Sequence, residues 1–286
     1  MLTISQDNLT EIPLSSPYFP SEWKELPDCP QTLQALGDIS LLKGSKLAIV
    51  GSRRTPANAL KLGVEIAKTL SHELVIVTGT ADGGDSAAIE GALCGGGRVI
   101  CLLAGGFSSL PQCNLALLEK VAKRGLILSA HPFETEVRAF SYEYRNRLLA
   151  KLCDSVLVLG AGEKSGALIT AKYASTFEKK IFALPYPPNS ASGAGCNQLI
   201  KKGAYLTESA KDVAQKLGID LSEKEKNVSL TPDEEELYNR LQESEAHASE
   251  LALATGIPVF KLRAILSSLE VKGLVVSLGG NRYAAV

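Results

Sequence analysis

The chain contains the segment Leu47-Ala48-Ile49-Val50-Gly51-Ser52-Arg53-Arg54, in which an apolar run passes directly into glycine, serine and arginine. The apolar part predicts a buried strand, and the amphipathic pattern of residues 57–70 predicts a helix after it. Gly51 lets the chain turn sharply out of the strand, and Arg53 offers a planar fork that suits phosphate. The segment therefore favours an anion site at the turn, although Gly51 is also compatible with a tight turn alone.

The same alternation continues along the chain. Further apolar runs lie at residues 74–78, 98–103, 126–129, 155–159 and 180–184, each followed by helical or loop sequence. Near-continuous apolar strands of this kind indicate a parallel sheet that is covered on both faces. Right-handed crossovers then bring the carboxyl ends of the strands to one edge, where ligands bind. We therefore predict an α/β domain over residues 41–218, with a doubly wound, mostly parallel sheet.

Glycine-rich or arginine-rich stretches recur where the predicted strands end. Backbone amides at a helix N-terminus, with a basic side chain nearby, hold a phosphate, and several such sites along one edge hold a nucleotide or a nucleic-acid strand. The candidate residues are Gly51, Ser52, Arg53, Arg54, Gly79, Gly83, Gly84, Arg145, Asn146, Arg147, Lys164, Ser165, Gly166 and Thr170. The first turn lacks the pattern G-x-G-x-x-G and the chain lacks a P-loop, so neither a conventional NAD site nor an ATP site is predicted.

Charge is segregated along the chain. Residues 41–218 carry 22 Lys and Arg against 14 Asp and Glu, which is a net charge of +8. Residues 1–40 carry one Lys against six acids, and residues 231–286 carry five basic against eight acidic side chains, so the whole chain has a net charge of -1. A positive field confined to the middle domain suits phosphate binding. Ordinary surface charge is the alternative explanation.

Length and composition predict roughly two domains, because the chain has 286 residues of which 45% are hydrophobic. No run approaches the roughly 20 apolar residues of a membrane helix, and the N-terminus lacks the order of a signal peptide, so we expect a cytoplasmic protein with no membrane contact. The six cysteines form no C-x-x-C pair, and the three histidines show no metal-ligand spacing. Neither disulfides nor a metal site nor a cofactor is therefore predicted.

Two parts of the candidate site have competing interpretations. Asp85 precedes a predicted helix at residues 87–93, and a capping role is favoured over a general base because no His, Ser or Cys partner is visible. In the predicted helix at residues 140–149, Arg145 and Arg147 diverge by about 200° of rotation, so only one is expected to face a phosphate. The aromatic side chains of this helix are expected to pack in the core rather than to stack on bases.

The remaining segments differ from the middle domain. Residues 1–40 are expected to form an N-terminal extension, and the short, charged segment 219–230 to form a linker. Residues 231–286 predict a winged helix with three helices and a hairpin. Such domains often read DNA through the third helix, but the acidic charge here favours contact with protein or weak contact with DNA.

Taken in order, the motifs of residues 18–286 resemble those of the DNA-processing protein A family (DprA, also called Smf). The matching motifs are Ala48-Ile49-Val50-Gly51-Ser52-Arg53-Arg54, Thr78-Gly79-x-Ala81-x-Gly83-x-Asp85, Phe140-x-x-x-x-Arg145-Asn146-Arg147, Ser165-Gly166-x-Leu168-x-Thr170-Ala171 and Gly195-x-Asn197-x-Leu199-Ile200-x-x-Gly203-Ala204. The resemblance adds Asn197 to the candidate residues. It implies an extended Rossmann-type domain that binds single-stranded DNA without strong sequence preference, forms a homodimer and delivers the strand to the recombinase RecA during natural transformation. The family's usual N-terminal helical domain has no counterpart in residues 1–40.

Three functions are compatible with these features. The favoured one is a non-catalytic recombination mediator that protects incoming single-stranded DNA and loads RecA. The second is a nucleotide-binding or nucleotide-hydrolysing Rossmann-like protein, but residues 164–171 lack the glutamate of the expected motif P-G-G-x-G-T-x-x-E. The third is a transcription regulator that acts through the winged helix.

Overall fold

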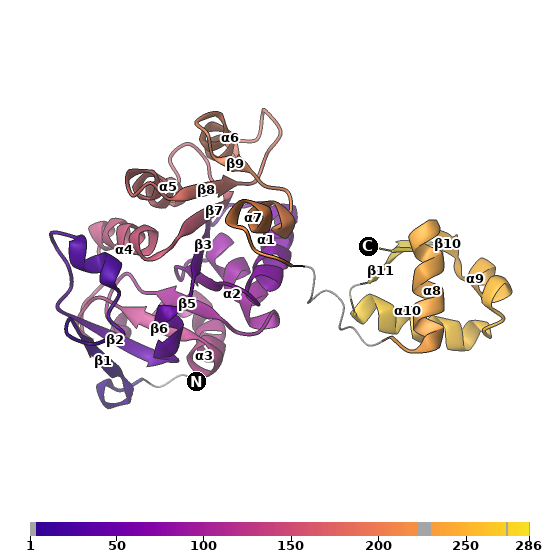
Figure 1. The fold of residues 1–286 in the computed structure, drawn as a ribbon, viewed down its shortest axis with the longest axis horizontal. Coiled ribbons are helices and arrows are strands. Elements are labelled where there is room, and N and C mark those ends of the chain that lie inside the picture. Colours follow the sequence, from indigo (N-terminus) through magenta and orange to yellow (C-terminus); the bar gives the residue numbers. More distant parts are fainter. Residues whose placement is uncertain (1–3, 222–229, 273, 286) are drawn as a thin grey trace. The chain divides into compact units, whose positions relative to one another are not determined.

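The computed structural model describes residues 4–221, 230–272 and 274–285. The chain divides into two compact units, Met1–Ile219 and Asp220–Val286 (Figure 1). Most of the predicted linker at residues 219–230 lies outside the described residues. Each unit is therefore described by itself.

The first unit is built on a nine-stranded sheet with the strand order β1-β2-β6-β5-β4-β3-β7-β8-β9. The strands from β3 to β9 pair in parallel, and those from β3 to β6 are buried along almost their whole length, as expected for a sheet covered on both faces. The predicted doubly wound, mostly parallel sheet is confirmed. These strands are β3 (Lys46–Gly51), β4 (Val75–Thr78), β5 (Val99–Leu102), β6 (Leu126–Ser129), β7 (Ser155–Gly160), β8 (Lys180–Ala183) and β9 (Tyr205–Leu206).

Helices cover both faces of this sheet (Figure 1). Helices α1 to α3 connect the strands that run outward from β3 to β6. Helix α4 crosses back from β6 to β7 on the other side of β3, and α5 connects β7 to β8. Because crossovers are right-handed, the two groups lie on opposite faces. The helices are α1 (Ala57–Leu70), α2 (Gly84–Cys94), α3 (Leu115–Arg124), α4 (Ala139–Leu152), α5 (Ala167–Thr176), α6 (Ala194–Lys201) and α7 (Ala210–Leu217), and short 3-10 helices lie at Gln6–Asn8, Ser21–Glu25, Ile39–Lys43, Phe107–Ser109 and Gln112–Asn114.

Residues 4–40, which the sequence predicted as an N-terminal extension, contribute two strands to the sheet of this same domain. Strand β1 (Thr10–Pro13) pairs antiparallel with β2 (Thr32–Gly37), and β2 pairs antiparallel with β6. Between them, Trp23 is fully buried and its Nε1 donates a hydrogen bond of 2.9 Å to the carbonyl oxygen of Leu148 in α4. The segment escaped prediction because its short strands mix polar and apolar residues, as edge strands commonly do.

The second unit is a winged helix, as predicted. Its helices are α8 (Pro232–Glu243), α9 (Ala248–Thr255) and α10 (Val259–Val271), and its three-stranded sheet has the order β10-β12-β11, with β10 at Ala246–His247, β11 at Val275–Gly279 and β12 at Arg282–Ala285. Leucines from α8, α9 and α10 form its core. Within the described residues no single helix is long and apolar enough to cross a membrane, and α9 and α10 satisfy that test only as a pair bent by 111°.

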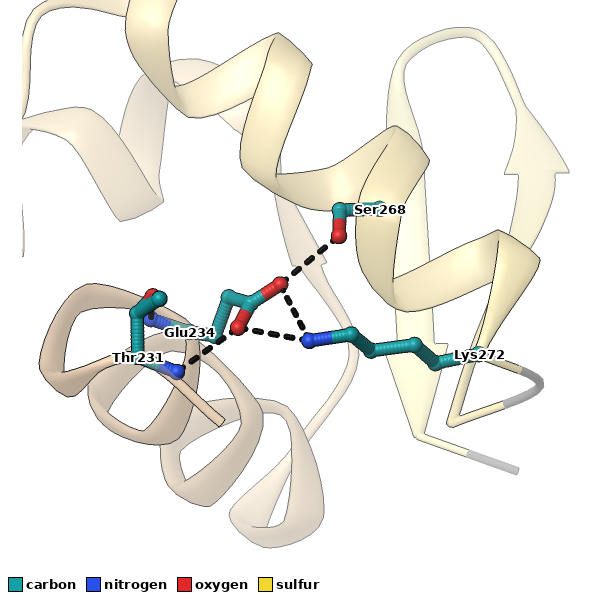
Figure 2. A network of polar contacts seen from close by, with 4 residues as sticks. All are labelled: Thr231, Glu234, Ser268 and Lys272. Carbon is teal, nitrogen blue, oxygen red and sulfur yellow. Dashed lines mark hydrogen bonds and ion pairs between the residues drawn. The ribbon is translucent and has the colours of Figure 1, made fainter. Parts of the chain in front are cut away.

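A buried carboxylate ties the start of α8 to the end of α10 (Figure 2). Glu234 accepts hydrogen bonds of 2.7 Å from the backbone N–H of Thr231, from the hydroxyl of Ser268 and, at both oxygens, from the ammonium of Lys272. The hydrogen bond from Lys272 lowers the pKa of Glu234 to about 2. Two helices that are distant in sequence are thus held together by one side chain.

Candidate nucleic-acid interface

The candidate site lies where the strand order reverses, between β3 and β7. Here the backbone N–H of Ser52, just beyond β3, donates a hydrogen bond of 2.8 Å to the carbonyl oxygen of Gly160 at the end of β7. Ligands of open α/β sheets bind at such a switch point, beyond the carboxyl ends of the strands. A hollow of about 360 Å³ opens at this point.

Most of the predicted residues meet in this hollow. Its lining residues include Gly51, Ser52, Arg53, Arg54, Gly79, Arg145, Asn146, Ser165, Gly166 and Thr170, together with Val50, Ala81, Asp85, Tyr142, Leu149 and Ala167. The other predicted residues, Gly83, Gly84, Arg147, Lys164 and Asn197, are not part of this lining. Four stretches that are far apart in sequence therefore converge on one concave surface.

Glycines allow the two loops of the site to touch. A Cβ on Gly84 would lie 2.3 Å from Cα of Gly51, so neither position has room for a side chain. Gly83 has φ of +82°, and a Cβ on it would lie 2.5 Å from the carbonyl oxygen of Ser52. The predicted close backbone approach thus occurs between the loops after β3 and β4, and it fixes the turn that carries Arg53.

Asp85 and Arg145 form the floor of the hollow. Asp85 is only 5% exposed, and it accepts a hydrogen bond of 3.2 Å from the backbone N–H of Ala81 in the preceding loop. The predicted capping role was wrong, because the N-cap of α2 is Gly83 and Asp85 lies within the first turn of the helix. Burial raises the pKa of Asp85, and the positive charge of Arg145 opposes that rise.

Arg145 and Arg147 do diverge as the helical spacing predicts. Arg145 is 6% exposed, and its guanidinium donates hydrogen bonds of 2.9 Å to the carbonyl oxygen of Leu102 and to Oδ1 of Asn146. Arg147 instead forms an ion pair with Asp28 and lies 5.5 Å from the centre of the Tyr144 ring. Arg145 is therefore the arginine of this helix that lines the hollow.

The N-terminus of α5 forms the opposite wall. Asn146 donates a hydrogen bond of 3.3 Å from Nδ2 to the carbonyl oxygen of Gly166, which connects this wall to α4. A Cβ on Gly166 would meet no atom within 4 Å, so this residue borders open space. Lys164 lies two residues before Gly166 in the same turn, and its side chain is exposed. The positive end of a helix dipole thus faces the hollow, with a lysine near it.

The aromatic residues of α4 do not share one role. Tyr144 is partly buried, and its ring lies 5.4 Å from that of His131, in agreement with the predicted packing role. Phe140 and Tyr142, by contrast, are 67% and 43% exposed, so the expectation that all these rings pack in the core was wrong. Both residues lie in the first turn of α4, whereas most of the buried residues of this helix lie further along it.

Asn197 supports the site from outside the hollow. Its Nδ2 donates a hydrogen bond of 2.9 Å to the carbonyl oxygen of Tyr186, and its Oδ1 accepts one of 3.0 Å from the N–H of the same residue. The Tyr186 hydroxyl in turn donates a hydrogen bond of 2.6 Å to the carbonyl oxygen of Leu159 in β7. Sequence reasoning missed Tyr186, because these contacts depend on how the loop after β8 folds back.

Basic residues of the winged helix are mostly engaged within that unit. Lys261 pairs with Asp233 at 2.6 Å, Lys272 with Glu234 at 2.7 Å, and Arg282 with Glu245 at 3.2 Å, while Arg240 donates to the carbonyl oxygen of Ala254. The unit also exposes apolar side chains, with Leu253 92% and Phe260 80% exposed. This surface offers little positive charge to a phosphate backbone.

Comparison with known proteins assigns the chain to a family. The family model for DNA recombination-mediator protein A matches residues 11–218, and the model for the DprA winged helix domain matches residues 222–281. The chain belongs to the DprA/Smf family. The DprA protein of Bacillus subtilis is 35% identical over 233 residues, which covers 79% of this chain and 75% of that protein. Protein Smf of Escherichia coli is 28% identical over 290 residues, which covers 97% of this chain and 78% of the relative.

Solved DprA structures have the same fold. DprA from Streptococcus pneumoniae aligns with a TM-score of 0.69 at 33% identity, over 73% of this chain and 74% of that one. DprA from Helicobacter pylori, a structure described for its single-stranded DNA binding mode, aligns with a TM-score of 0.67 at 30% identity, over 74% of this chain and 98% of that one. The predicted family and fold are thus confirmed, and the chain is a member of a family of DNA-processing recombination mediators.

Proposed function

We propose that this DprA/Smf-family chain binds single-stranded DNA along the carboxyl edge of its large sheet and acts without catalysis. The observation that carries the proposal is the hollow at the switch point, where exposed Arg53 and Arg54 stand above the buried guanidinium of Arg145. A phosphate in this hollow meets arginine forks on one side and the N-terminus of α5 on the other.

Ten of the predicted residues then take three roles. Arg53, Arg54, Ser165 and Gly166 contact a phosphate directly, and Lys164 contacts the next phosphate along the strand. Arg145 supplies a fixed positive charge from the floor of the hollow. Gly83, Gly84, Arg147 and Asn197 position these groups without touching DNA, because they support loops or pair with other residues.

Unpaired bases are favoured by the exposed rings of Phe140 and Tyr142. Aromatic stacking contributes ~1 to 3 kcal/mol per base and is open only to bases that are not already paired. Tyr142 lines the phosphate hollow, whereas Phe140, two residues earlier, is rotated from it by about 200° around the helix and would meet a base only further along the strand. This arrangement favours a single strand over a duplex.

Catalysis by the lining residues is not favoured. Asp85 is the carboxylate of the hollow, but it is engaged by the amide of Ala81 and by the charge of Arg145. No lining residue is a His, Cys, Glu or Lys that would complete an acid and base pair with it. Nucleotide hydrolysis therefore has less support than binding.

Delivery of the strand to RecA in natural transformation, in the cytoplasm, is the cellular role that family membership favours. A homodimer has support from strand β9, which is the last strand of the sheet and has one unpaired edge within the described residues; Tyr205 is 37% exposed there and Leu206 49%. Exposed edges of this kind pair readily with another strand. A Leu206→Glu variant that stays monomeric in sedimentation velocity, beside a dimeric parent, tests this surface.

The test of DNA binding is fluorescence anisotropy of a labelled oligo-dT and of a matched duplex. We expect the single strand to bind more tightly, and Arg53→Ala to weaken that binding about tenfold without lowering the thermal unfolding temperature. Arg263→Ala is the matched control, because Arg263 is exposed on the winged helix. A duplex preference, or equal effects of the two substitutions, would overturn the proposed site.

A further inference from the structure

The phosphate hollow contains a carboxylate. Asp85 is one of its lining residues and is only 5% exposed. Among the residues that the structure describes, it is the one Asp or Glu in this lining. Two negative charges in one enclosed space repel each other, so a carboxylate is an unexpected neighbour for a phosphate. Phosphate binding alone does not account for it.

Asp85 is held in the hollow by its backbone. It lies in the first turn of α2, directly after Gly84, and Gly84 packs against Gly51 so closely that a Cβ on it would lie 2.3 Å from Cα of Gly51. Oδ2 of Asp85 also accepts a hydrogen bond of 3.2 Å from the backbone N–H of Ala81. The carboxylate therefore stays close to the place that a phosphate would occupy.

The charged and titratable groups around this carboxylate come from several elements. They are Arg145 and Tyr142 of α4, Arg53 and Arg54 of the loop after β3, and Cys101 of β5, while β4 contributes the hydroxyl of Thr78. Helices α1 and α3 also contact α2, but none of their residues lines the hollow. Burial raises the pKa of the Cys101 thiol, so this group is uncharged at neutral pH. Arginines therefore supply the charge that Asp85 meets.

Asp85 and a bound phosphate use the same positive charge. Arg145 is 6% exposed and donates its hydrogen bonds to two neutral oxygens, those of Leu102 and Asn146. In the free protein its charge is thus balanced by Asp85. A space of about 360 Å³ is on the order of 10 Å across, so a phosphate inside it and the carboxylate interact through a medium of low dielectric. Each anion therefore weakens the attraction of Arg145 for the other.

A proton on the carboxylate removes this conflict. Burial already raises the pKa of Asp85 in the free protein. A phosphate nearby raises it further, because a like charge disfavours the ionised form. The neutral acid leaves the charge of Arg145 to the phosphate, so the protonated protein binds DNA more tightly. By linkage, binding then takes up a proton.

We propose that Asp85 takes up a proton from solvent when a phosphate enters the hollow, so that binding of single-stranded DNA is coupled to pH. Oδ2 keeps its hydrogen bond from Ala81, and the proton adds to Oδ1. Asp85 does not touch the phosphate, and it acts through its charge and through Arg145. The inference rests on the proposed single-strand binding and adds a regulation of the same site.

The test is anisotropy of a labelled oligo-dT without terminal phosphates, at pH 7.5 and pH 5.5 and constant ionic strength, with the full chain. We expect about fivefold tighter binding at pH 5.5, because a pKa change of about one unit allows a change of up to tenfold. Asp85→Asn is neutral at both pH values, so it should bind about fivefold more tightly than the parent at pH 7.5 and show no pH dependence. Asp82→Asn, at an exposed position three residues earlier, is the matched control and should keep the parent's pH dependence.

The outcomes separate the two proposals. Absence of single-strand binding by the parent overturns the proposed function and this inference with it. Binding that does not change with pH, or the parent's full pH dependence in Asp85→Asn, overturns the proton uptake alone. Weaker binding by Asp85→Asn at pH 7.5 would also overturn it, since a purely structural role predicts that loss.

A second measurement needs no variant, because loss of a buried charge is expected to lower the stability of Asp85→Asn. In the parent at pH 6, the carbon-13 resonance of the Asp85 carboxyl should move toward its protonated position when oligo-dT is added. The Asp82 carboxyl is the internal control and should not move in this way. An Asp85 resonance that stays in place while DNA binds would overturn the proposal.

Discussion

Asp85 and Arg145 meet at Gly79, where a Cβ would lie 2.4 Å from Oδ2 of Asp85 and 2.2 Å from Nη1 of Arg145. The glycine thus leaves the space in which a carboxylate and a guanidinium come together beneath the phosphate hollow. Because both groups are almost completely buried, each depends on the other for charge compensation. Loss of either side chain should therefore lower the stability of the protein.

We predict that Asp85→Asn and Arg145→Met each lower the free energy of unfolding by ~3 kcal/mol, because each leaves an uncompensated buried group. The double variant should lose less than the sum, with a coupling of at least ~1 kcal/mol. Urea unfolding at pH 7 measures these values. Arg147 lies in the same helix but forms a surface ion pair, so Arg147→Met should lower the free energy of unfolding by less than ~1 kcal/mol. Strict additivity of the two core substitutions would contradict the coupling.

Two glycine substitutions should separate folding from binding. Gly166→Ala adds a methyl group that meets no protein atom within 4 Å, so the chain should fold normally, yet the methyl would occupy space for the phosphate and weaken oligo-dT binding about tenfold. Gly79→Ala forces a methyl against Asp85 and Arg145 and should lower the thermal unfolding temperature. Calorimetry and anisotropy on both variants check this. Unchanged DNA affinity in Gly166→Ala would exclude that wall from the binding surface.

Salt dependence should report the number of phosphates bound. Three to five contacts on a single strand predict a slope of roughly -2 to -3.5 for the logarithm of the binding constant against that of salt concentration. Arg53→Ala should make the slope about 0.7 less steep, because one contact is lost. Titrations at several salt concentrations measure it. A slope near zero would rule out phosphate contacts as the source of affinity.

The buried contact of Glu234 predicts an acid-sensitive winged helix. Because the pKa of Glu234 is lowered from 4.5 to about 2, its stabilisation is present above about pH 4.5 and is lost as the pH falls toward 2. Glu234→Gln should destabilise the unit by ~2 kcal/mol at neutral pH, since it loses hydrogen bonds to a charged group. Hydrogen exchange of α8 and α10 amides in the full chain measures both effects. Glu236→Gln, at an exposed position, should retain the parent's pH dependence.

Much of the first unit was predictable because its strands are buried on both faces. Apolar runs such as residues 126–129 are short, as expected for a strand buried on both faces rather than for a helix, and this run coincides with β6. Strand β2 gave no such signal, because it contains Gln34 and lies near the edge of the sheet. Its place depends on pairing with β6, a contact between distant parts of the chain.

Within the site, helical spacing predicted that Arg145 and Arg147 point apart. It did not predict which one faces the hollow, since that depends on the rotation of α4 against the sheet and on Asp28, which engages Arg147. The partner of Asp85 was likewise hidden, because Arg145 lies 60 residues further along the chain. Sequence motifs therefore identified the loops of the site, but the role of each residue depends on contacts between distant parts of the chain.

The chain contains a single tryptophan, Trp23, buried against α4 with its indole nitrogen bonded to the carbonyl oxygen of Leu148. The tryptophan fluorescence of the unlabelled protein therefore comes from one known position in the first unit, and its hydrogen-bond partner Leu148 lies three residues beyond Arg145 in α4. Emission from this ring reports unfolding of the large domain and any shift of α4 when a ligand enters the hollow. The winged helix contributes no tryptophan signal, so its transitions are optically silent in the same experiment.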